Sequence, residues 1–208
     1  GITKVILGCR SPEKAEAAKK TLEESTGKTG VFEVLIIDVS NLDSVRKAVS
    51  ELKEPIDGLM MNAGGAGGSD GSVMTEDGVT AIVAVNVLGH VLLVDLLLAQ
   101  NKLKGSAVYA GSEGARGIPS MNMKMPVLES GSVEEFTAIC DGSFYDKDGD
   151  KSFEAMYAYT KLVAALWMSS MARKEPNLRF LTMSPGGTTG TDGARDLPFF
   201  KKMFYSIV

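Results

Sequence analysis

The chain has few of the residues on which metal sites and disulfide frameworks depend. Its 208 residues include one histidine and two cysteines, Cys9 and Cys140. Two cysteines are too few for a disulfide framework and fit no metal-ligand spacing, and a single histidine leaves no zinc site of the usual kind. Such sparse cysteine usage is typical of a reducing compartment, so we expect a cytoplasmic or organelle-stromal protein without a structural metal.

Two short segments resemble metal-binding sequences but lack part of the required pattern. Asp146, Asp148 and Asp150 are spaced as in a calcium loop, but Lys151 occupies the position that needs glycine. The methionines of MNMKM, at 121–125, are soft-metal ligands in other settings, but here they fit better as an adaptable apolar cover over an apolar substrate. We therefore predict no bound metal at either segment.

The chain also lacks a strong excess of charge. Lys plus Arg is 22 and Asp plus Glu is 26, which gives a net charge of -4. A mildly acidic chain without a basic cluster is a poor candidate for binding nucleic acid. Hydrophobic residues make up 44% and charged residues 23%, which excludes wholesale disorder and a collagen-like chain. A length of 208 residues suffices for one domain, and we predict a single domain over 1–208.

One apolar run, Gly78 to Ala99, is long enough to cross a bilayer. Asn86, His90 and Asp95 interrupt it, and an aspartate at the bilayer centre costs ~2.5–3.5 kcal/mol on insertion scales. No Lys or Arg flanks its N-terminal end. We therefore predict a buried core helix and no integral membrane segment. No targeting signal is visible, but the chain starts immediately before a strand, so an upstream leader is left open.

Apolar strands alternate with helices along the chain, a pattern typical of βαβ units and a parallel sheet. The second helix has a capping-box start at Ser40 and Asp43. Residues 113–152 show no clear periodicity and are expected to form a long irregular insertion near the active site. The expected strands are 4–9, 32–38, 56–61, 106–110 and 179–183, and the expected helices are 11–24, 40–52, 75–101 and 153–173.

Chemistry is expected beyond the carboxyl ends of these strands, where open parallel sheets bind ligands. Tyr157 and Lys161 lie one turn apart on the same helix face. A phenol with a pKa ~10 is a poor acid or base at neutral pH unless something favours the phenolate, which a neighbouring cation would do. Ser112 follows a strand and is able to donate a hydrogen bond to a carbonyl oxygen. Asn86 lies in an apolar helix, so its amide must have a partner.

Five segments in order carry a family resemblance: Asn62-Ala63-Gly64, Asn86 in VNVLGH, Ser112, Tyr157-x-x-x-Lys161 and Ser184-Pro185-Gly186. Together, each at the end of the expected element, they resemble the short-chain dehydrogenases/reductases from about Lys4 to about Thr191. The CRS at 9–11, VNVLGH and the wide gap from serine to tyrosine are most similar to the retinol dehydrogenase and protochlorophyllide reductase branch. The resemblance implies a Rossmann-like doubly wound parallel sheet.

The resemblance also implies roles for individual residues. Tyr157 would be the acid/base, Lys161 and Ser112 would assist it, and Asn86 would hold a water of the proton relay. Asp38 resembles the position that contacts the adenine ring, although it would equally serve to cap the following helix. The implied cofactor-binding residues are Arg10, Ser11, Asp38, Val39, Asn62, Ala63, Gly64, Tyr157, Lys161, Pro185 and Gly186.

Arg10 bears on the choice of cofactor. A guanidinium at this strand end would neutralise a 2'-phosphate, whereas NAD-binding sheets more often place an acidic group there. No Asp or Glu occupies the position. The expected cofactor is therefore NADP rather than NAD.

One family feature has no counterpart in the sequence. The family begins with a strand and a glycine-rich turn, T-G-x-x-x-G-x-G, whereas this chain begins at what resembles the second strand. The Gly-rich run 62–71 follows a later strand and cannot replace that turn. A further strand would normally follow Ser184-Pro185-Gly186. We expect a sheet truncated at the N-terminus, with a central strand missing, and shortened at the C-terminus.

Two function classes follow. The first is an NADP-dependent oxidoreductase that transfers hydride to or from a carbonyl or alcohol of an apolar small molecule; reduction of a carbon–carbon double bond is the variant left open. The second is a non-catalytic nucleotide-binding or interaction protein, or an inactive fragment, that retains the scaffold. The complete set of Ser112, Tyr157 and Lys161 favours the first. Family members commonly associate as homodimers or homotetramers, which is the assembly that the resemblance implies.

Overall fold

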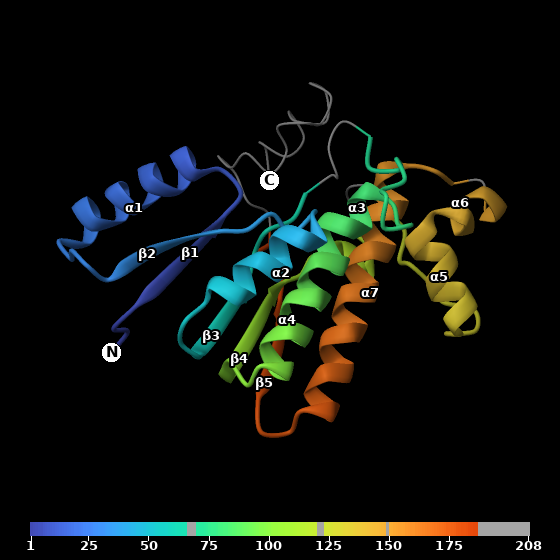
Figure 1. Ribbon diagram of the computed structural model, residues 1–208. Coiled ribbons are helices and arrows are strands. Elements are labelled where there is room, and N and C mark those ends of the chain that lie inside the picture. Colours follow the sequence, from blue (N-terminus) through green and yellow to red (C-terminus); the bar gives the residue numbers. More distant parts are fainter. Residues whose placement is uncertain (66–69, 120–122, 149, 187–208) are drawn as a thin grey trace.

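The computed structural model describes residues 1–65, 70–119, 123–148 and 150–186. Strands and helices alternate as expected, and the fold class is the predicted one, a Rossmann-like α/β fold with parallel strands (Figure 1). The strands are β1 (Val5–Cys9), β2 (Phe32–Ile36), β3 (Ile56–Met61), β4 (Leu103–Ala110) and β5 (Arg179–Met183). The longer helices are α1 (Pro12–Thr26), α2 (Leu42–Glu51), α4 (Gly89–Ala99), α5 (Val133–Asp141) and α7 (Phe153–Lys174).

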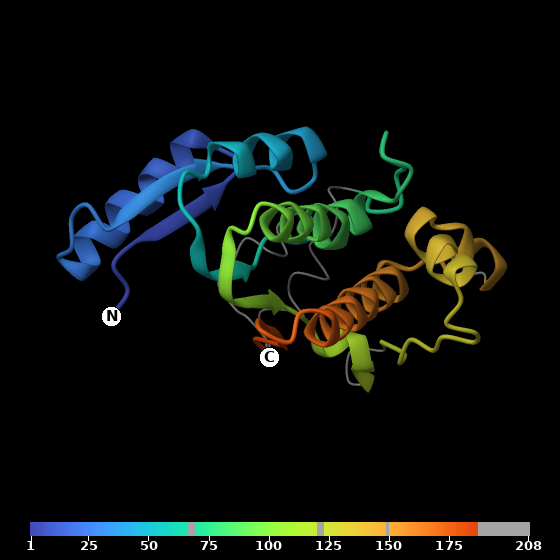
Figure 2. The same ribbon diagram turned by 60° about the horizontal axis from the view of Figure 1, so that its bottom comes forward.

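The strands form two parallel sheets rather than one. β1 pairs with β2, with Val5 opposite Phe32, and β3–β4–β5 make the second sheet in that order. Within the described ranges, β1 and β3 each have one edge without a strand partner. This is the arrangement expected of a sheet that lacks a central strand. Figures 1 and 2 show β1, β2 and α1 on one side of the molecule, and α2 packs on α4 next to them.

Local capping explains where the early helices begin, with one correction. Ser11 caps α1 as expected: its side chain accepts the Lys14 amide, and Pro12 is the first helical residue. The expected cap at Ser40 is wrong, because Asn41 caps α2 by accepting the Ser44 amide. Ser40 instead donates its amide and hydroxyl to Asp38 Oδ1, which closes the turn before the helix.

The apolar run forms a single interior helical rod, Ala81–Ala99, that starts later than predicted. It consists of α3 (Ala81–Val83), a π-helical turn η1 (Ala84–Leu88) and α4. It is long and apolar enough to cross a membrane, but half of it is buried, and it packs against α2, α7 and β4. The predicted core helix is therefore present. Residues 75–80 form a turn instead, in which the Thr75 amide bonds to the Val79 carbonyl.

The expectation of an irregular segment over 113–152 is wrong for about half of it. A short 3-10 helix η2 (Glu113–Arg116), α5 and α6 (Ser143–Asp148) lie inside this stretch. α5 begins at the Ser132 cap, whose side chain accepts the Glu135 amide, and ends at Gly142 in a left-handed conformation. The capping-box spacing from Ser132 to Glu135 was present in the sequence but was not read as a helix start. Met121 lies outside the described residues.

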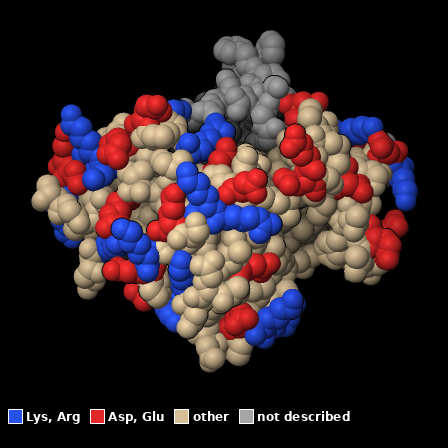
Figure 3. Space-filling view, in the orientation of Figure 1, with Lys and Arg blue, Asp and Glu red and all other residues tan. Residues whose placement is uncertain are grey.

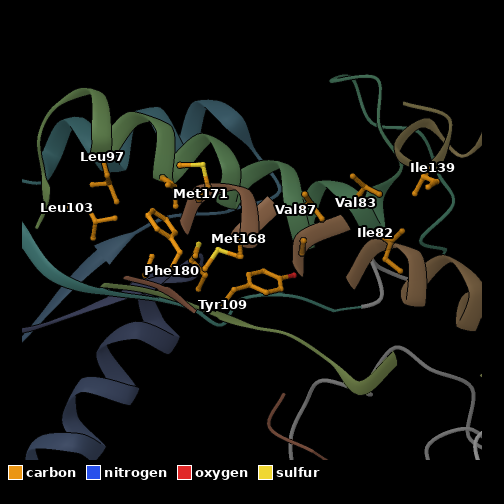
Figure 4. Packing of buried hydrophobic residues seen from close by; sticks show 14 of the residues in the cluster. Ile82, Val83, Val87, Leu97, Leu103, Tyr109, Ile139, Met168, Met171 and Phe180 are labelled. Carbon is orange, nitrogen blue, oxygen red and sulfur yellow. The ribbon is translucent and has the colours of Figure 1, made fainter. Parts of the chain in front are cut away.

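The core lies between the β3–β4–β5 sheet and the helices that cover one face of it. Figure 4 shows this cluster, in which Tyr109, Phe180 and Met168 meet beneath the helices. On the opposite face of the sheet, Met60 and Leu181 are 51% and 52% exposed. The visible surface intermingles acidic and basic side chains (Figure 3).

Candidate functional site

Ser112 and Tyr157 are brought together where the end of β4 meets α7. Ser112 leaves β4, accepts the Gly114 amide at 3.1 Å and starts η2, which packs against α7. Its hydroxyl lies near the Tyr157 phenol and acts to lower the pKa of that phenol. Gly114 permits this approach, because a Cβ there would lie 3.3 Å from Ser112 Oγ and 3.5 Å from the Tyr157 ring. A serine and a phenol in contact suit a group that accepts a hydrogen bond and a proton, as a carbonyl oxygen does.

Lys161 lies one turn further along α7 and points into the interior. Its Nζ donates to Tyr109 Oη at 3.2 Å and to the Ala110 carbonyl at 3.1 Å. It also lies over two rings, 4.9 Å from the Tyr109 centroid and 5.5 Å from that of Tyr157. Burial lowers the pKa of Lys161 to about 8, because removing the ammonium from water disfavours its charged form.

The phenol of Tyr157 is also perturbed by burial. Desolvation raises its pKa, and the hydrogen bond with Ser112 acts in the opposite direction. The neutral phenol is therefore the resting form. That form suits a proton donor, and Ser112 and the ammonium of Lys161 are the groups that would ease its ionisation.

Asn86 lies at the centre of the π-helical turn, fully buried. Its Nδ2 donates to the Gly65 carbonyl at 2.7 Å and to the Ile82 carbonyl at 2.8 Å, and its Oδ1 accepts the Gly65 amide at 3.3 Å. The expectation that this amide must have a partner is confirmed. The side chain thus clamps the loop after β3 from both sides, much as a neighbouring strand would, and π-turns of this kind often mark functional sites.

The loop after β3 is held close to the same cluster. The Ala63 carbonyl accepts a 2.7 Å hydrogen bond from His90 Nε2, so Nε2 carries the ring proton. Burial lowers the pKa of His90, and the imidazole is neutral at pH 7. A Cβ on Gly64 would lie 2.7 Å from Asn86 Oδ1 and 3.7 Å from Lys161 Nζ. Only glycine fits there, so the exposed loop 62–64 can approach Asn86 and Lys161.

The remaining predicted cofactor residues lie at other strand ends. Arg10 is exposed after β1, and no ion pair of the described residues includes it. The Ser11 hydroxyl is occupied by Glu13 Oε2 at 2.7 Å. After β2, Asp38 accepts from Ser40 and does not cap the helix, while Val39 is buried. Pro185 and Gly186 are exposed after β5.

These residues are the ones that would hold a dinucleotide cofactor. Arg10, Val39, Gly64 and Gly186 follow the ends of β1, β2, β3 and β5. Lys161 lies close to Gly64. Arg10 stands at the N-terminus of a 15-residue helix, where the helix dipole also favours an anion. The chain thus offers a positively charged helix N-terminus at Arg10, a glycine that lets the loop 62–64 lie close to Asn86, and the cluster of Ser112, Tyr157 and Lys161.

Part of the 113–152 segment lies beside Gly114 and Tyr157. Met123 is buried, and its Cε would lie 3.1 Å from a Cβ on Gly114, which also faces Tyr157. An open hollow beside it is lined by Arg116, Gly117, Pro119, Met123, Lys124 and Met125. Of the two metal-like segments, the acidic one forms an ion pair between Lys151 and Asp146.

Sequence reasoning missed three residues of this cluster. Gly65 is the partner of Asn86, His90 fixes the Ala63 carbonyl, and Tyr109 bonds to both Lys161 and Asn86. In the sequence, His90 stands out only as one of the polar interruptions of the apolar run 78–99. Tyr109, three residues before Ser112 in SAVYAGS, resembles an ordinary core aromatic of a strand, so nothing in its sequence context indicates its hydrogen bonds.

Comparisons with known proteins agree with this geometry. The family model described as short chain dehydrogenase matches residues 1–123. Protochlorophyllide reductase of Avena sativa is 28% identical over 96% of this chain and 68% of that protein. Human retinol dehydrogenase 13 is 39% identical over 50% of this chain and 30% of that protein. Among the other relatives, the chain spans 25% of short-chain dehydrogenase anuD of Penicillium roqueforti and 55% of protochlorophyllide reductase A of Hordeum vulgare.

Solved structures share the fold. An alcohol dehydrogenase from the archaeon Thermococcus sibiricus, complexed with 5-hydroxy-NADP, aligns with a TM-score of 0.63 at 18% identity, covering 94% of this chain and 70% of that one. A short-chain dehydrogenase/reductase from Caenorhabditis elegans, solved with cofactor, aligns with a TM-score of 0.64 at 18% identity, covering 98% and 68%. With the family model matching more than half of its length, this chain belongs to the short-chain dehydrogenase family of nicotinamide-dependent oxidoreductases.

Proposed function

We propose that this chain is the catalytic part of an NADP-dependent oxidoreductase that interconverts a carbonyl and an alcohol on an apolar small molecule. The observation that carries the proposal is that Ser112 and Tyr157 meet beside Gly114, with Lys161 one helical turn away and its Nζ 5.5 Å from the Tyr157 ring centroid. A scaffold that only binds nucleotide has no need of this combination. The bound nicotinamide supplies or accepts the hydride.

In reduction, the chain's own residues handle the proton. Ser112 donates a hydrogen bond to the substrate oxygen, and the neutral phenol of Tyr157 gives its proton to that oxygen as negative charge develops there. The ammonium of Lys161 stabilises the phenolate that remains, by its charge and at short range in a site with little water. The loop 62–64 and Asn86 fix the position of the cofactor beside these groups.

The apolar substrate class is supported by the residues next to Tyr157. Met123 and Pro119 give the hollow beside Gly114 an apolar lining, and Arg116 and Lys124 border it with positive charge. The similarity to protochlorophyllide reductase makes reduction of a carbon–carbon double bond the second candidate. A panel of apolar ketones and conjugated double bonds distinguishes the two by product.

The catalytic test compares Tyr157→Phe with Tyr159→Phe in the complete protein. Tyr159 is the matched control because its hydroxyl bonds to the Val127 backbone. Loss of the acid/base phenol should lower kcat by about 10²–10⁴-fold, while the control retains activity. Equal activity of Tyr157→Phe and the parent protein would refute the proposed role.

Cofactor choice is tested by titrating NADPH and NADH against the parent protein, Arg10→Ala and Arg46→Ala. Loss of a charge-assisted contact to a 2'-phosphate should weaken NADPH binding by about tenfold or more and leave NADH binding unchanged. Arg46 is an exposed arginine on α2 and should have no effect on either nucleotide. An equal loss of both nucleotides in Arg10→Ala would contradict a 2'-phosphate contact.

A further inference from the structure

Tyr109 is a buried aromatic residue whose hydroxyl has two polar partners. It lies on β4 with 1% of its surface exposed, beneath the helices that cover the sheet (Figure 4). The hydroxyl donates to the Asn86 backbone carbonyl at 2.8 Å and accepts from Lys161 Nζ at 3.2 Å. It therefore bridges the π-helical turn and the catalytic lysine, which come from different helices.

The Tyr109 hydroxyl makes the two hydrogen bonds that a water molecule between Lys161 and the Asn86 carbonyl would otherwise make. The side-chain amide of Asn86 is occupied by Gly65 and Ile82, while its backbone carbonyl accepts from the Tyr109 hydroxyl, which in turn accepts from Lys161. A phenol hydroxyl, like a water, donates one hydrogen bond and accepts another. Unlike a water, it is fixed in position by a packed ring. The edge of that ring meets His90, with centroids 5.8 Å apart.

We propose that Tyr109 is a positioning residue of this site, whose hydroxyl connects Lys161 to the Asn86 carbonyl and fixes the ammonium beside Tyr157. The proposal rests on the proposed oxidoreductase function. Tyr109 acts through Lys161 and does not exchange a proton with substrate. Burial raises the pKa of Tyr109 well above its usual value, so the phenol stays protonated throughout the working range of pH.

The electrostatic surroundings explain why this hydrogen bond matters. The titratable groups that face Lys161 are Tyr109 from β4, Tyr157 from its own helix and His90 from α4. His90 is neutral and both tyrosines are protonated, and no acidic group of the described residues forms an ion pair with Lys161. The charged form of Lys161 is thus sustained by two acceptors, Tyr109 Oη and the Ala110 carbonyl.

Removing one acceptor should make the ammonium harder to maintain. In Tyr109→Phe, the pKa of Lys161 is expected to fall further below about 8, since a hydrogen bond to the charged form has been lost. We expect the alkaline limb of the kcat profile for carbonyl reduction to move to lower pH by at least about half a unit, with kcat near neutral pH reduced about tenfold.

Tyr145→Phe is the matched control. Tyr145 is equally buried, at 3% exposure, but its hydroxyl has no hydrogen-bond partner among the described residues. Its removal should leave both kcat and the pH profile unchanged. A purely structural role for Tyr109 would lower the amount of folded protein without moving the alkaline limb, and an unmoved limb in folded Tyr109→Phe overturns the proposal.

A second measurement does not depend on turnover. The complete protein is labelled with ¹³C at lysine Cε, the Lys161 resonance is assigned by its loss in Lys161→Met, and its titration is followed by NMR. A lower midpoint in Tyr109→Phe than in the parent supports the bridge, and an identical midpoint overturns it. Absence of oxidoreductase activity in the parent would refute the proposed function while this titration still tested Tyr109.

Should Tyr109→Phe fail to fold, a crystal structure of the cofactor-bound parent provides the test. The expected result is Tyr109 Oη within hydrogen-bond distance of both Lys161 Nζ and the Asn86 carbonyl. A water molecule joining those two groups, with the tyrosine hydroxyl elsewhere, would overturn the proposal.

Discussion

The ammonium of Lys161 is buried, and no carboxylate of the described residues forms an ion pair with it, so burial governs its acid–base behaviour. Burial lowers the pKa of Lys161 and raises that of Tyr157, so the dry surroundings favour the neutral form of both groups. The proposed proton transfer would need a charged lysine next to a phenol that is able to ionise. Hydrogen bonds from Ser112 and to Tyr109 oppose desolvation, so small changes in these partners should affect rate more than stability.

Gly64 and its neighbour Gly65 provide a test of whether the loop after β3 needs a glycine to lie close to Asn86. A Cβ at Gly64 would meet Asn86 Oδ1 at 2.7 Å, whereas a Cβ at Gly65 would have no heavy atom within 4 Å. Gly64→Ala should therefore displace the loop or the Asn86 clamp and cost about 1–3 kcal/mol, with weaker cofactor binding. Chemical denaturation and nucleotide titration measure both effects. Gly65→Ala, the control, should change neither, and similar behaviour of the two variants would contradict the close approach.

At the residue scale, the positions of the proposed catalytic side chains were predictable and their hydrogen-bond partners were not. Ser112, Tyr157 and Lys161 are placed by strand ends and by helical spacing, which the sequence pattern shows directly. The hydrogen bonds of Tyr109 and His90 join residues 23 and 27 positions apart in the sequence. Such bonds depend on how the helical stretch 81–99 packs on the sheet, and hydrophobic periodicity does not predict that packing.

At the scale of elements, a single carboxylate organises the start of α5. Glu135 accepts the backbone amides of Glu129, Ser130 and Gly131 at 2.7, 2.9 and 2.6 Å, and also the Ser130 hydroxyl. These hydrogen bonds favour the ionised form and lower the pKa of Glu135 to about 2. The turn 129–131 and the helix thus depend on one charged group.

That dependence predicts acid sensitivity of the turn. The unfolded chain has the ordinary glutamate pKa of 4.5, above the folded value of about 2, so it binds more protons in this interval. Stability is therefore present above pH 4.5 and decreases as the pH falls towards 2. Melting temperature measured between pH 6 and 2.5 should fall less steeply in Glu135→Gln, which should already melt lower at pH 6. Glu16→Gln on α1 is the control, and an unchanged slope in Glu135→Gln would count against this account.

The same element shows why the 113–152 segment was misread. Phe136, Ile139 and Cys140 provide too short an apolar pattern for a helix to be recognised by periodicity. Capping was the available signal: Ser132 and Glu135 stand three residues apart, and Gly142 follows the last turn. Capping alone is ambiguous, however, as Ser40 and Asp43 show, since the neighbouring Asn41 is the cap that the structure uses.

At the scale of the whole molecule, the β1–α1–β2 unit is joined to the rest through α2 and α4. The two sheets share no strand pairing, but α2 packs on α4 (Figure 2). The Val39 carbonyl lies against Gly89 of α4. The parallel order of strands was predictable from their alternation with helices. The division into two sheets agrees with the expected absence of a central strand. The contact between the Val39 carbonyl and Gly89, however, could not be predicted from the sequence.

Gly89 should therefore control the coupling between the two units. Gly-to-Ala within a helix ordinarily stabilises by roughly 0.5–1 kcal/mol, but a Cβ here would lie 1.8 Å from the Val39 carbonyl oxygen. Backbone atoms cannot yield as a flexible side chain does, so Gly89→Ala should be destabilising by about 1–3 kcal/mol. Hydrogen exchange locates the loss: amides of β1 and β2 should become less protected than those of β4.

Gly105→Ala is the control for the regional loss of amide protection, because its effect is expected in the other sheet. A Cβ at Gly105 would lie 2.3 Å from the Asp57 carbonyl oxygen, within the pairing of β3 and β4. Its exchange should therefore increase in the second sheet and leave β1 and β2 protected. Opposite regional patterns would show that the two sheets are stabilised separately and coupled through Gly89. Uniform loss of protection in both variants would mean instead that the chain unfolds as one cooperative unit, in which case the Val39–Gly89 contact has no special part in joining its halves.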